Sequence, residues 1–256
     1  MAESTNTGCC PKGSEPALAA NYKALGTVSK IEDLPIYTVG EGKKSAIVLN
    51  YDIYGFDGGR TKLICDQLAA EGHFVILPDY YRGESFPVDA EVNVENLTPF
   101  VHTYPWEKLQ ADLEGKVLPF LKEKGFEKIG ALGFCWGAWI NLNISGTGKL
   151  DCAANAHPSF NAENFFGKSE VELAKRVQCP QLIFAAGNDL PNIKEGGEIV
   201  NLLKEKTFGD KCVFREFPDV VHGFASRGEL EKPEVASAVK EFIEGVTQFF
   251  KANLAQ

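Results

Sequence analysis

The sequence lacks any apolar run long enough to cross a membrane as a helix, which takes about 20 residues. Residues 1–20 also lack a basic start followed by an apolar core, so they do not resemble a secretory signal. Basic residues are outnumbered, with 26 Lys and Arg against 35 Asp and Glu and a net charge of −9. An acidic surface repels nucleic acids and anionic membranes at long range. We therefore expect a cytoplasmic protein that binds neither nucleic acid nor a membrane.

The familiar spacings of metal sites are absent as well. No two cysteines have CxxC spacing and no HExxH sequence occurs, so we expect no metal. The seven cysteines are an odd number scattered along the chain, which fits a reducing compartment better than a set of disulfides. Free cysteine is often buried in protein cores. Four cysteines are interpreted as core or strand-edge residues: Cys65, Cys152, Cys179 and Cys212.

Strand and helix patterns alternate along the chain. With 256 residues, 44% of them hydrophobic, the chain can bury one substantial core. The alternation predicts an α/β fold with a mostly parallel central sheet and helices on both faces. The expected strands are 46–50, 74–78, 128–132, 152–156, 181–185 and 212–217. The expected helices are 61–71, 106–124 with a kink at Pro119, and 234–254.

Two segments fit neither pattern. Residues 1–25 are expected to form a loosely attached arm on a single domain that spans 1–256. Residues 84–104 form a long connection, and loops of that length are uncommon unless they are functional or locally structured. This second segment is interpreted either as a lid or pocket wall or as a connection without such a role.

The most informative stretch is Gly133-Phe134-Cys135-Trp136-Gly137, which follows an apolar strand pattern and precedes a helix-compatible run. This spacing is typical of a nucleophile elbow, a sharp strand-to-helix turn with the reactive residue at its tip. A helix that begins just after Cys135 favours the thiolate over the thiol. The pattern predicts that Cys135 is a nucleophile. Taken alone it is weak, because free cysteine is often a small buried hydrophobic residue.

Two later strand patterns are followed by residues that complete a triad. Asp189 comes after the strand at 181–185, and His222 comes after the strand at 212–217. The order nucleophile, acid, histidine is that of the α/β-hydrolase triad. Singly, Asp189 could start a turn and His222 could be a hydrogen-bonded loop residue, but the shared order favours catalysis.

The chemistry gives each residue a task. His222 takes the thiol proton and later protonates the leaving alcohol or activates water, while Asp189 orients the imidazole. The oxyanion needs backbone N–H donors. The expected donors are Trp136, directly after the nucleophile, and Ile53, in the loop after the strand at 46–50.

Together these motifs resemble the dienelactone hydrolase (carboxymethylenebutenolidase) family, α/β-hydrolases that use cysteine in place of serine. The resemblance extends over nearly the whole length and includes Cys9-Cys10-Pro11-Lys12-Gly13, which is similar to the start of eukaryotic members. The other matching pieces are Tyr51-Asp52-Ile53-Tyr54-Gly55, Pro78-Asp79-Tyr80-Tyr81-Arg82-Gly83, Gly133-Phe134-Cys135-Trp136-Gly137, Gly187-Asn188-Asp189 and His222-Gly223-Phe224 with Arg227 nearby. The resemblance implies an α/β-hydrolase fold and a cofactor-independent hydrolase of small lactones or esters that works through an acyl-cysteine intermediate.

Departures from the family pattern concern the substrate site. Well-known bacterial members have a glutamate near the position of Asp52 that partners the resting cysteine, and Asp52 is one methylene shorter. Asp52 is therefore expected to support catalysis weakly or through water, to leave proton transfer to His222, or only to shape the oxyanion loop. Arg82 and Arg227 lie close to two substrate-binding arginines of those members, slightly offset, and either could instead be a solvated surface charge.

The expected partner is thus a small-molecule lactone or ester, and the expected assembly is a monomer or small homo-oligomer. The alternative is a ligand-binding or sensory relative that keeps the pocket but has little turnover, since a fold does not fix a function.

Overall fold

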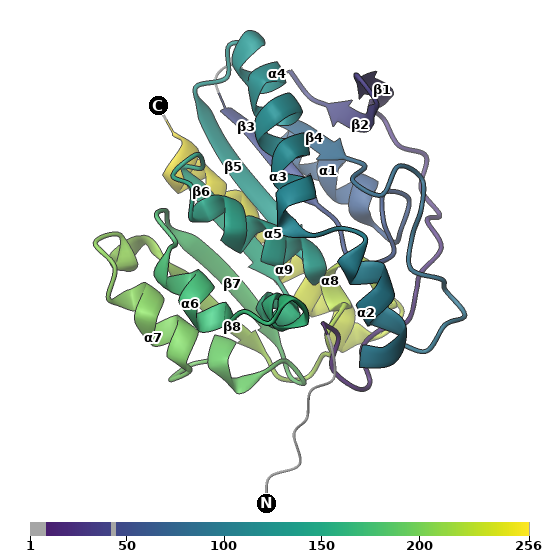
Figure 1. Ribbon diagram of the computed structural model, residues 1–256, viewed down its shortest axis with the longest axis vertical. Helices are drawn as coiled ribbons and strands as arrows, with labels where there is room; N and C mark the ends of the chain where they lie inside the picture. The colour runs from purple at the N-terminus through teal and green to yellow at the C-terminus, as the bar shows by residue number, and fades with distance from the viewer. Residues whose placement is uncertain (1–8, 42–44, 256) are drawn as a thin grey trace, which may run out of the picture.

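A computed structural model describes residues 9–41 and 45–255, and one eight-stranded sheet runs through this part of the chain (Figure 1). The strands lie in the order β1-β2-β4-β3-β5-β6-β7-β8. β2 is antiparallel to both β1 and β4, whereas all the other neighbouring pairs are parallel. The strands are β1 (Thr27–Ile31), β2 (Leu34–Val39), β3 (Ser45–Asn50), β4 (Phe74–Pro78), β5 (Lys128–Phe134), β6 (Cys152–Ala156), β7 (Gln181–Ala186) and β8 (Val213–Phe217).

Helices cover both faces of this sheet. In Figure 1, α3 (Trp106–Asp112), α5 (Trp136–Ser145) and α6 (Glu170–Lys175) lie in front of the sheet, and α1 (Thr61–Ala70) and α9 (Pro233–Leu254) lie behind it. The other α-helices are α2 (Val94–His102), α4 (Leu118–Glu123), α7 (Glu198–Lys204) and α8 (Phe224–Arg227). A π-helical segment, Leu113–Val117, joins α3 to α4, and short 3₁₀ helices are Phe160–Phe166, Pro191–Ile193 and Gly209–Lys211. The expected α/β class with a mostly parallel sheet is confirmed.

The core lies on both sides of the parallel strands, as their nearly continuous apolar sequences require. Every residue of β4, β6 and β7 is buried. The same is true of α5, whose apolar residues and buried polar residues alike pack on β3, β5 and β6. A helix buried in this way has little freedom to tilt, so the turn at its N-terminus is held firmly in place.

All six expected strands are present, with ends within two residues of the expected positions. The sequence analysis missed β1 and β2, the antiparallel edge of the sheet. The expected helix over 106–124 is present from 106 to 123, but it contains a π-helical turn between α3 and α4. Pro119 follows the π-helical turn directly, and a proline inside a helix cannot donate a hydrogen bond to the preceding turn. Residues 84–104 are also not a simple loop, since they contain α2.

The expected loose arm is only partly described, because residues 1–8 lie outside the described residues. Cys9 and Cys10 are both buried. Further along, the N–H of Glu15 donates to the carbonyl of His222 at 2.7 Å, and that of Gly59 donates to the carbonyl of Leu18 at 2.9 Å. The segment from Cys9 to Leu18 is therefore packed on the domain, in contrast to the expected loose attachment.

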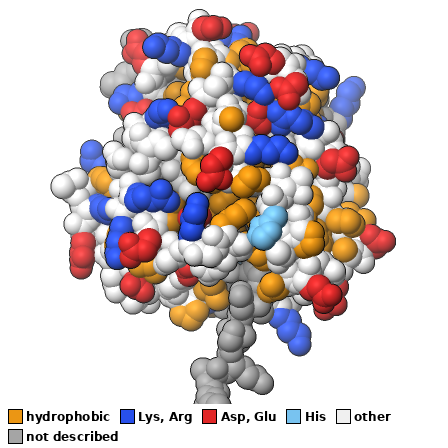
Figure 2. Space-filling model, viewed as in Figure 1, with side chains coloured by type: hydrophobic (Ala, Val, Ile, Leu, Met, Phe, Trp, Pro, Cys, Tyr) orange, Lys and Arg blue, Asp and Glu red, His pale blue; other side chains and the backbone are white. Residues whose placement is uncertain are grey.

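The surface is charged but mixed in sign. On the face shown in Figure 2, acidic and basic side chains alternate around small apolar patches. Within the described ranges, no helix combines the length and the apolar character that a membrane-spanning segment needs.

The tight packing of α5 on the end of β3 generates a stability prediction. A Cβ added at Gly137 would lie 2.1 Å from the carbonyl oxygen of Asn50, and a backbone atom cannot rotate away. We expect Gly137→Ala to destabilise the protein by about 3 kcal/mol, measured by urea denaturation. The control is Gly115→Ala, where nothing lies within 4 Å of the added carbon. That change should be neutral or stabilise by up to about 1 kcal/mol. Equal effects of the two substitutions would contradict the packing described here.

Candidate active site

Cys135 lies at the tip of a sharp turn between β5 and α5. Its backbone has φ 51° and ψ −115°, a conformation that L-residues rarely adopt. The turn is fixed by two hydrogen bonds, from the Cys135 N–H to the Ala156 carbonyl at 3.2 Å and from the Ser159 N–H to the Cys135 carbonyl at 3.0 Å. The turn also requires glycine at position 133, where the backbone of α5 comes so close that an added Cβ would lie 2.5 Å from the Gly137 carbonyl oxygen. These are the features of a nucleophile elbow.

His222 and Asp189 meet at the same edge of the sheet, after β8 and β7. The Nδ1 of His222 is 2.7 Å from the Oδ1 of Asp189, and both side chains are almost completely buried. Asp189 is itself fixed, because its Oδ2 accepts a hydrogen bond from the Ala186 N–H at 2.7 Å. The backbone N–H of His222 donates to the Asn188 side chain at 2.6 Å. These contacts fix the orientation of the His222 ring. Its other nitrogen, Nε2, forms no hydrogen bond with a described residue.

Electrostatics favour a charged pair formed by Cys135 and His222. Burial opposes ionisation of Cys135, but hydrogen bonds from Cys10 and Cys9 and the positive charge of His222 outweigh it, so the pKa of Cys135 lies well below its ordinary value. Burial alone would lower the pKa of His222, but the negative charges of Cys135 and Asp189 raise it to about 9. Both shifts favour a thiolate at Cys135 beside an imidazolium at His222.

Three groups cover the sulfur of Cys135. The Sγ of Cys10 lies 3.4 Å from the Sγ of Cys135, and the Sγ of Cys9 lies 3.8 Å from that of Cys10. The hydroxyl of Ser159 donates to the Cys9 carbonyl, and its oxygen lies 3.3 Å from the Cys135 sulfur. The pKa of Cys10 is raised well above its ordinary value, first by its hydrogen bond to Cys135 and then by Cys9 and burial, so Cys10 remains a thiol donor. Together with the surrounding protein, these groups leave Cys135 no exposed surface.

Asp52 does not contact the nucleophile through a hydrogen bond but forms a buried ion pair with Arg227. The same Oδ2 atom of Asp52 accepts from the Ser226 hydroxyl at 2.9 Å, and its Oδ1 accepts from the Tyr54 N–H at 2.9 Å. The guanidinium of Arg227 lies 5.0 Å from the centre of the Tyr54 ring. Asp52 and Arg227 thus join the loop after β3 to helix α8.

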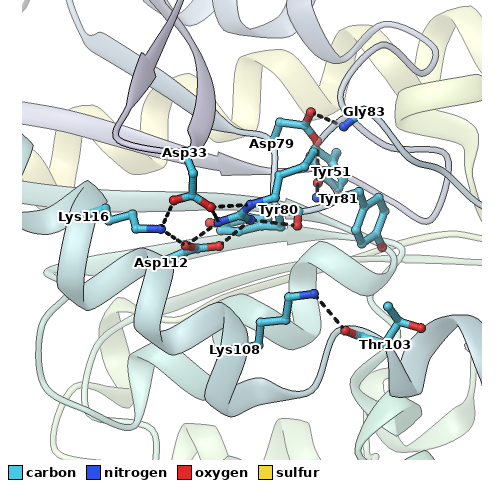
Figure 3. Close-up of polar contacts among 11 residues, drawn as sticks. Asp33, Tyr51, Asp79, Tyr80, Tyr81, Gly83, Thr103, Lys108, Asp112 and Lys116 are labelled. Carbon is cyan, nitrogen blue, oxygen red and sulfur yellow. Dashed lines mark hydrogen bonds and ion pairs between the residues drawn. The ribbon is translucent and has the colours of Figure 1, made fainter.

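Arg82 is placed differently. Its guanidinium forms two hydrogen bonds with Asp112, at 2.8 and 2.9 Å, and its Nε donates to Asp33 at 2.9 Å. Figure 3 shows Asp33, Asp112 and Lys116 gathered in this network beside Tyr80. The two acids engage all three nitrogens of the guanidinium, so Arg82 joins the turn between β1 and β2 to α3. That Arg82 binds substrate stays a prediction.

A cavity of about 830 Å³ reaches Cys10, whose sulfur lies 3.4 Å from that of Cys135, although no residue of the Cys135-His222-Asp189 set lines it. It is lined on one side by the segment from Cys10 to Ala17 and on another by Val88 and the stretch from Ala90 to Glu95. Tyr54 and Arg227 complete the lining. The pocket-wall interpretation of residues 84–104 therefore applies to this part of the segment. Another cavity, of about 790 Å³, borders Lys128, Val213 and Phe249 and includes no triad residue.

The two expected oxyanion donors come from adjacent loops. Trp136 is the first residue of α5, and the N–H groups of a first turn have no acceptor within the helix. Ile53 follows β3, whose end touches α5 at Gly137, where a Cβ would lie 2.5 Å from the Tyr51 carbonyl. Ile53 is held by its carbonyl, which accepts from the Phe86 N–H at 2.9 Å.

Sequence reasoning missed several neighbours of the nucleophile. Ser159, whose hydroxyl oxygen lies 3.3 Å from the Cys135 sulfur, and Ser226, which bonds to Asp52, have no recognisable motif. Cys9 and Cys10 did belong to a motif, but nothing in the local sequence indicates that a segment 125 residues away covers Cys135. His157 also lies here, with its ring 4.9 Å from that of His222, and burial lowers its pKa well below the ordinary value.

The chain is similar to known proteins over most of its length. The chain is 29% identical to "Hydrolase pyvD" from Aspergillus violaceofuscus over 256 residues, which cover 94% of each chain. It is 26% identical to "Carboxymethylenebutenolidase homolog" from Xenopus tropicalis, over 94% of this chain and 97% of that protein. A structure titled as a putative dienelactone hydrolase from Klebsiella pneumoniae superposes with a TM-score of 0.67 at 18% identity, over 90% of this chain and 99% of that one. That likeness shows the α/β-hydrolase fold.

The family model described as "Dienelactone hydrolase family" matches residues 35–254, which include β2 to β8 and the positions of Cys135, Asp189 and His222. With an elbow cysteine, a buried His–Asp pair and a matching sequence over most of its length, the chain belongs to the dienelactone hydrolase family and is a hydrolase of the esterase type.

Proposed function

We propose that the chain hydrolyses small lactones or esters through a Cys135-His222-Asp189 triad and an acyl-cysteine intermediate. The observation that carries the proposal is the combination of a strained elbow at Cys135 with a buried His222–Asp189 pair at the same edge of the sheet. Membership of the dienelactone hydrolase family supports the choice of lactones and esters as substrates.

The reaction begins with attack of the Cys135 thiolate on the carbonyl carbon, which moves the carbonyl electron pair onto oxygen. The N–H groups of Trp136 and Ile53 stabilise the oxyanion, each worth about 2.7–4 kcal/mol in comparable enzymes. The intermediate collapses and the C–O bond to the alcohol breaks, with His222 donating its proton to the leaving oxygen. His222 then removes a proton from water, hydroxide attacks the thioester, and the thiolate leaves.

The thiolate restricts the substrate class. It attacks readily at neutral pH but is also a good leaving group, so an intermediate with a strongly basic amine would return to reactants. Esters and lactones expel a less basic alkoxide, which His222 protonates as it departs. Peptide hydrolysis is therefore disfavoured.

Asp52 and Arg227 are assigned to substrate binding, whereas the triad carries out the chemical steps. Both oxygens of Asp52 are occupied by Arg227, Ser226 and the Tyr54 N–H, which supports leaving proton transfer to His222. Arg227 lines the cavity and has one acidic partner, so we assign it the recognition of a carboxylate on the substrate. Asp52 positions this arginine.

The nucleophile assignment is tested with Cys135→Ala. The variant should lose at least about 1,000-fold in kcat on dienelactone and on a p-nitrophenyl ester, because no other group supplies the covalent step. Intact mass spectrometry of the wild type should detect the acyl adduct. Cys212→Ala, at a cysteine outside the site, is the matched control. Equal rates for wild type and Cys135→Ala would refute the mechanism. Absence of both turnover and adduct in the wild type would favour the ligand-binding alternative.

The charged pair predicts a defined pH profile. The value of kcat/KM should rise as Cys135 loses its proton at low pH and fall as His222 loses its proton near pH 9, since His222 must protonate the leaving group. In Asp189→Asn the negative charge that raises the pKa of His222 is gone, so an NMR titration of the His222 ring should have its midpoint about 1–3 pH units lower. An unchanged midpoint would mean that Asp189 does not act on His222.

Recognition by Arg227 is tested with the double variant Asp52→Asn/Arg227→Met, because removal of both partners avoids an unpaired buried charge. Loss of a charge-assisted hydrogen bond should lower kcat/KM for a carboxylate-bearing lactone by about 10- to 100-fold relative to a neutral ester. Arg82→Lys is the control and should keep the ratio of the two substrates. A ratio unchanged in the double variant would exclude Arg227 as the carboxylate-binding residue.

A further inference from the structure

Three cysteine sulfurs form a compact buried cluster at the mouth of the site. Cys9, Cys10 and Cys135 have their Sγ atoms within 4.8 Å of one another, with 3.4 Å between Cys10 and Cys135 and 3.8 Å between Cys9 and Cys10. All three are free and buried. The proposed hydrolysis uses only one of them, so Cys9 and Cys10 have no assigned chemical role.

The spacing of the sulfurs fits thiolate coordination of a metal. Four ligands at a Zn–S distance of about 2.3 Å in a tetrahedron have their sulfurs about 3.8 Å apart. The distances among the three cysteines lie around this value, so an ion at the centre needs only small movements of the side chains. Thiolates prefer soft or borderline cations, of which zinc is a common example.

A further nitrogen donor lies near Cys135, although it is not within 4.8 Å of all three sulfurs. His222 is completely buried, and its Nε2 has no hydrogen-bond partner among the described residues. Its Nδ1 is held by Asp189 at 2.7 Å. A histidine whose other ring nitrogen bonds to a carboxylate is the usual arrangement of a zinc-binding histidine, because the carboxylate fixes the ring and raises its basicity.

We propose that Cys9, Cys10 and Cys135 bind a thiophilic divalent cation such as zinc, that the His222 ring moves to bring Nε2 in as the fourth ligand, and that the bound ion blocks the nucleophile. The thiols of Cys9 and Cys10 and the imidazolium of His222 release their protons to solvent as their lone pairs bind the ion. Because Cys135 then donates its electron pair to the metal, it cannot attack a carbonyl carbon. The ion also ties the segment around Cys10 to the elbow.

This site departs from the expectation that the chain holds no metal, and the reason is that its ligands come from two distant parts of the sequence. No short spacing such as CxxC records it. The site is formed by the turn at Cys135 and by the packing of the segment from Cys9 onwards, both of which depend on the fold.

The test uses the full chain, metal-free and kept reduced with a phosphine. Zinc affinity is measured by competition with a chromophoric chelator, zinc content by elemental analysis after gel filtration, and thiolate ligation by the charge-transfer absorption of the cobalt-loaded protein. We expect one zinc per chain. Cys10→Ser and Cys135→Ala should each weaken binding by at least about 100-fold, since even second-shell changes cost 10- to 100-fold. Cys212→Ser should bind as the wild type does.

Each result decides the proposal. Less than one-tenth of an equivalent of zinc on the wild type, unchanged affinity in both Cys10→Ser and Cys135→Ala, or loss of binding in Cys212→Ser would overturn it. Circular dichroism shows whether Cys10→Ser and Cys135→Ala are folded. If one of them is unfolded, the zinc affinity of the other decides the proposal. In the active enzyme, zinc should inhibit the wild type at concentrations at least about 100-fold below those that inhibit Cys10→Ser. The zinc affinity and the absorption of the cobalt-loaded protein are measured without substrate. The metal site can therefore be tested even if the protein does not hydrolyse esters or lactones.

Discussion

The backbone conformation of Cys135 is the constraint on which the site depends. A non-glycine residue in a rarely populated region costs about 1–3 kcal/mol, and it persists only where its surroundings determine it. β5 ends directly before Cys135 and α5 begins directly after it. The turn is also held by the hydrogen bonds of the Cys135 backbone with the Ala156 carbonyl, at the end of β6, and with the Ser159 N–H. If the turn relaxed, the sulfur would move away from His222, Ser159 and Cys10 together.

A chain of buried amides beneath the elbow strengthens this arrangement. The Asn50 side chain donates to Asn141 at 2.6 Å, Asn141 donates to Asn155 at 3.1 Å, and Asn155 donates to Gln181 at 3.1 Å. The chain connects β3, α5, β6 and β7, the elements that carry the elbow and lead to Asp189. Buried amides must be paired to be tolerated, so this chain favours a single register of α5 against the sheet.

Much of the fold could be predicted from the sequence because its signals are local. The buried strands read as apolar runs, and Cys135, Asp189 and His222 each follow one of them in the order of an α/β-hydrolase. Contacts between distant segments have no such signal. The sequence could not show that Asp112 and Asp33 bind Arg82, that Asp52 pairs with Arg227, or that Cys10 covers Cys135, because each depends on how helices and loops pack.

The complete burial of Cys135 has a consequence for how kinetic constants of this protein should be interpreted. A substrate can reach the sulfur only in molecules in which the segment around Cys10 has moved away from Cys135. The apparent affinity for substrate is therefore the intrinsic affinity multiplied by the fraction of molecules in this open state. Any change in the fraction of open molecules alters KM and leaves the rate of the chemical steps unchanged. Preparations that differ only near Cys9 and Cys10, for instance in an affinity tag, can therefore yield different KM values from identical active sites.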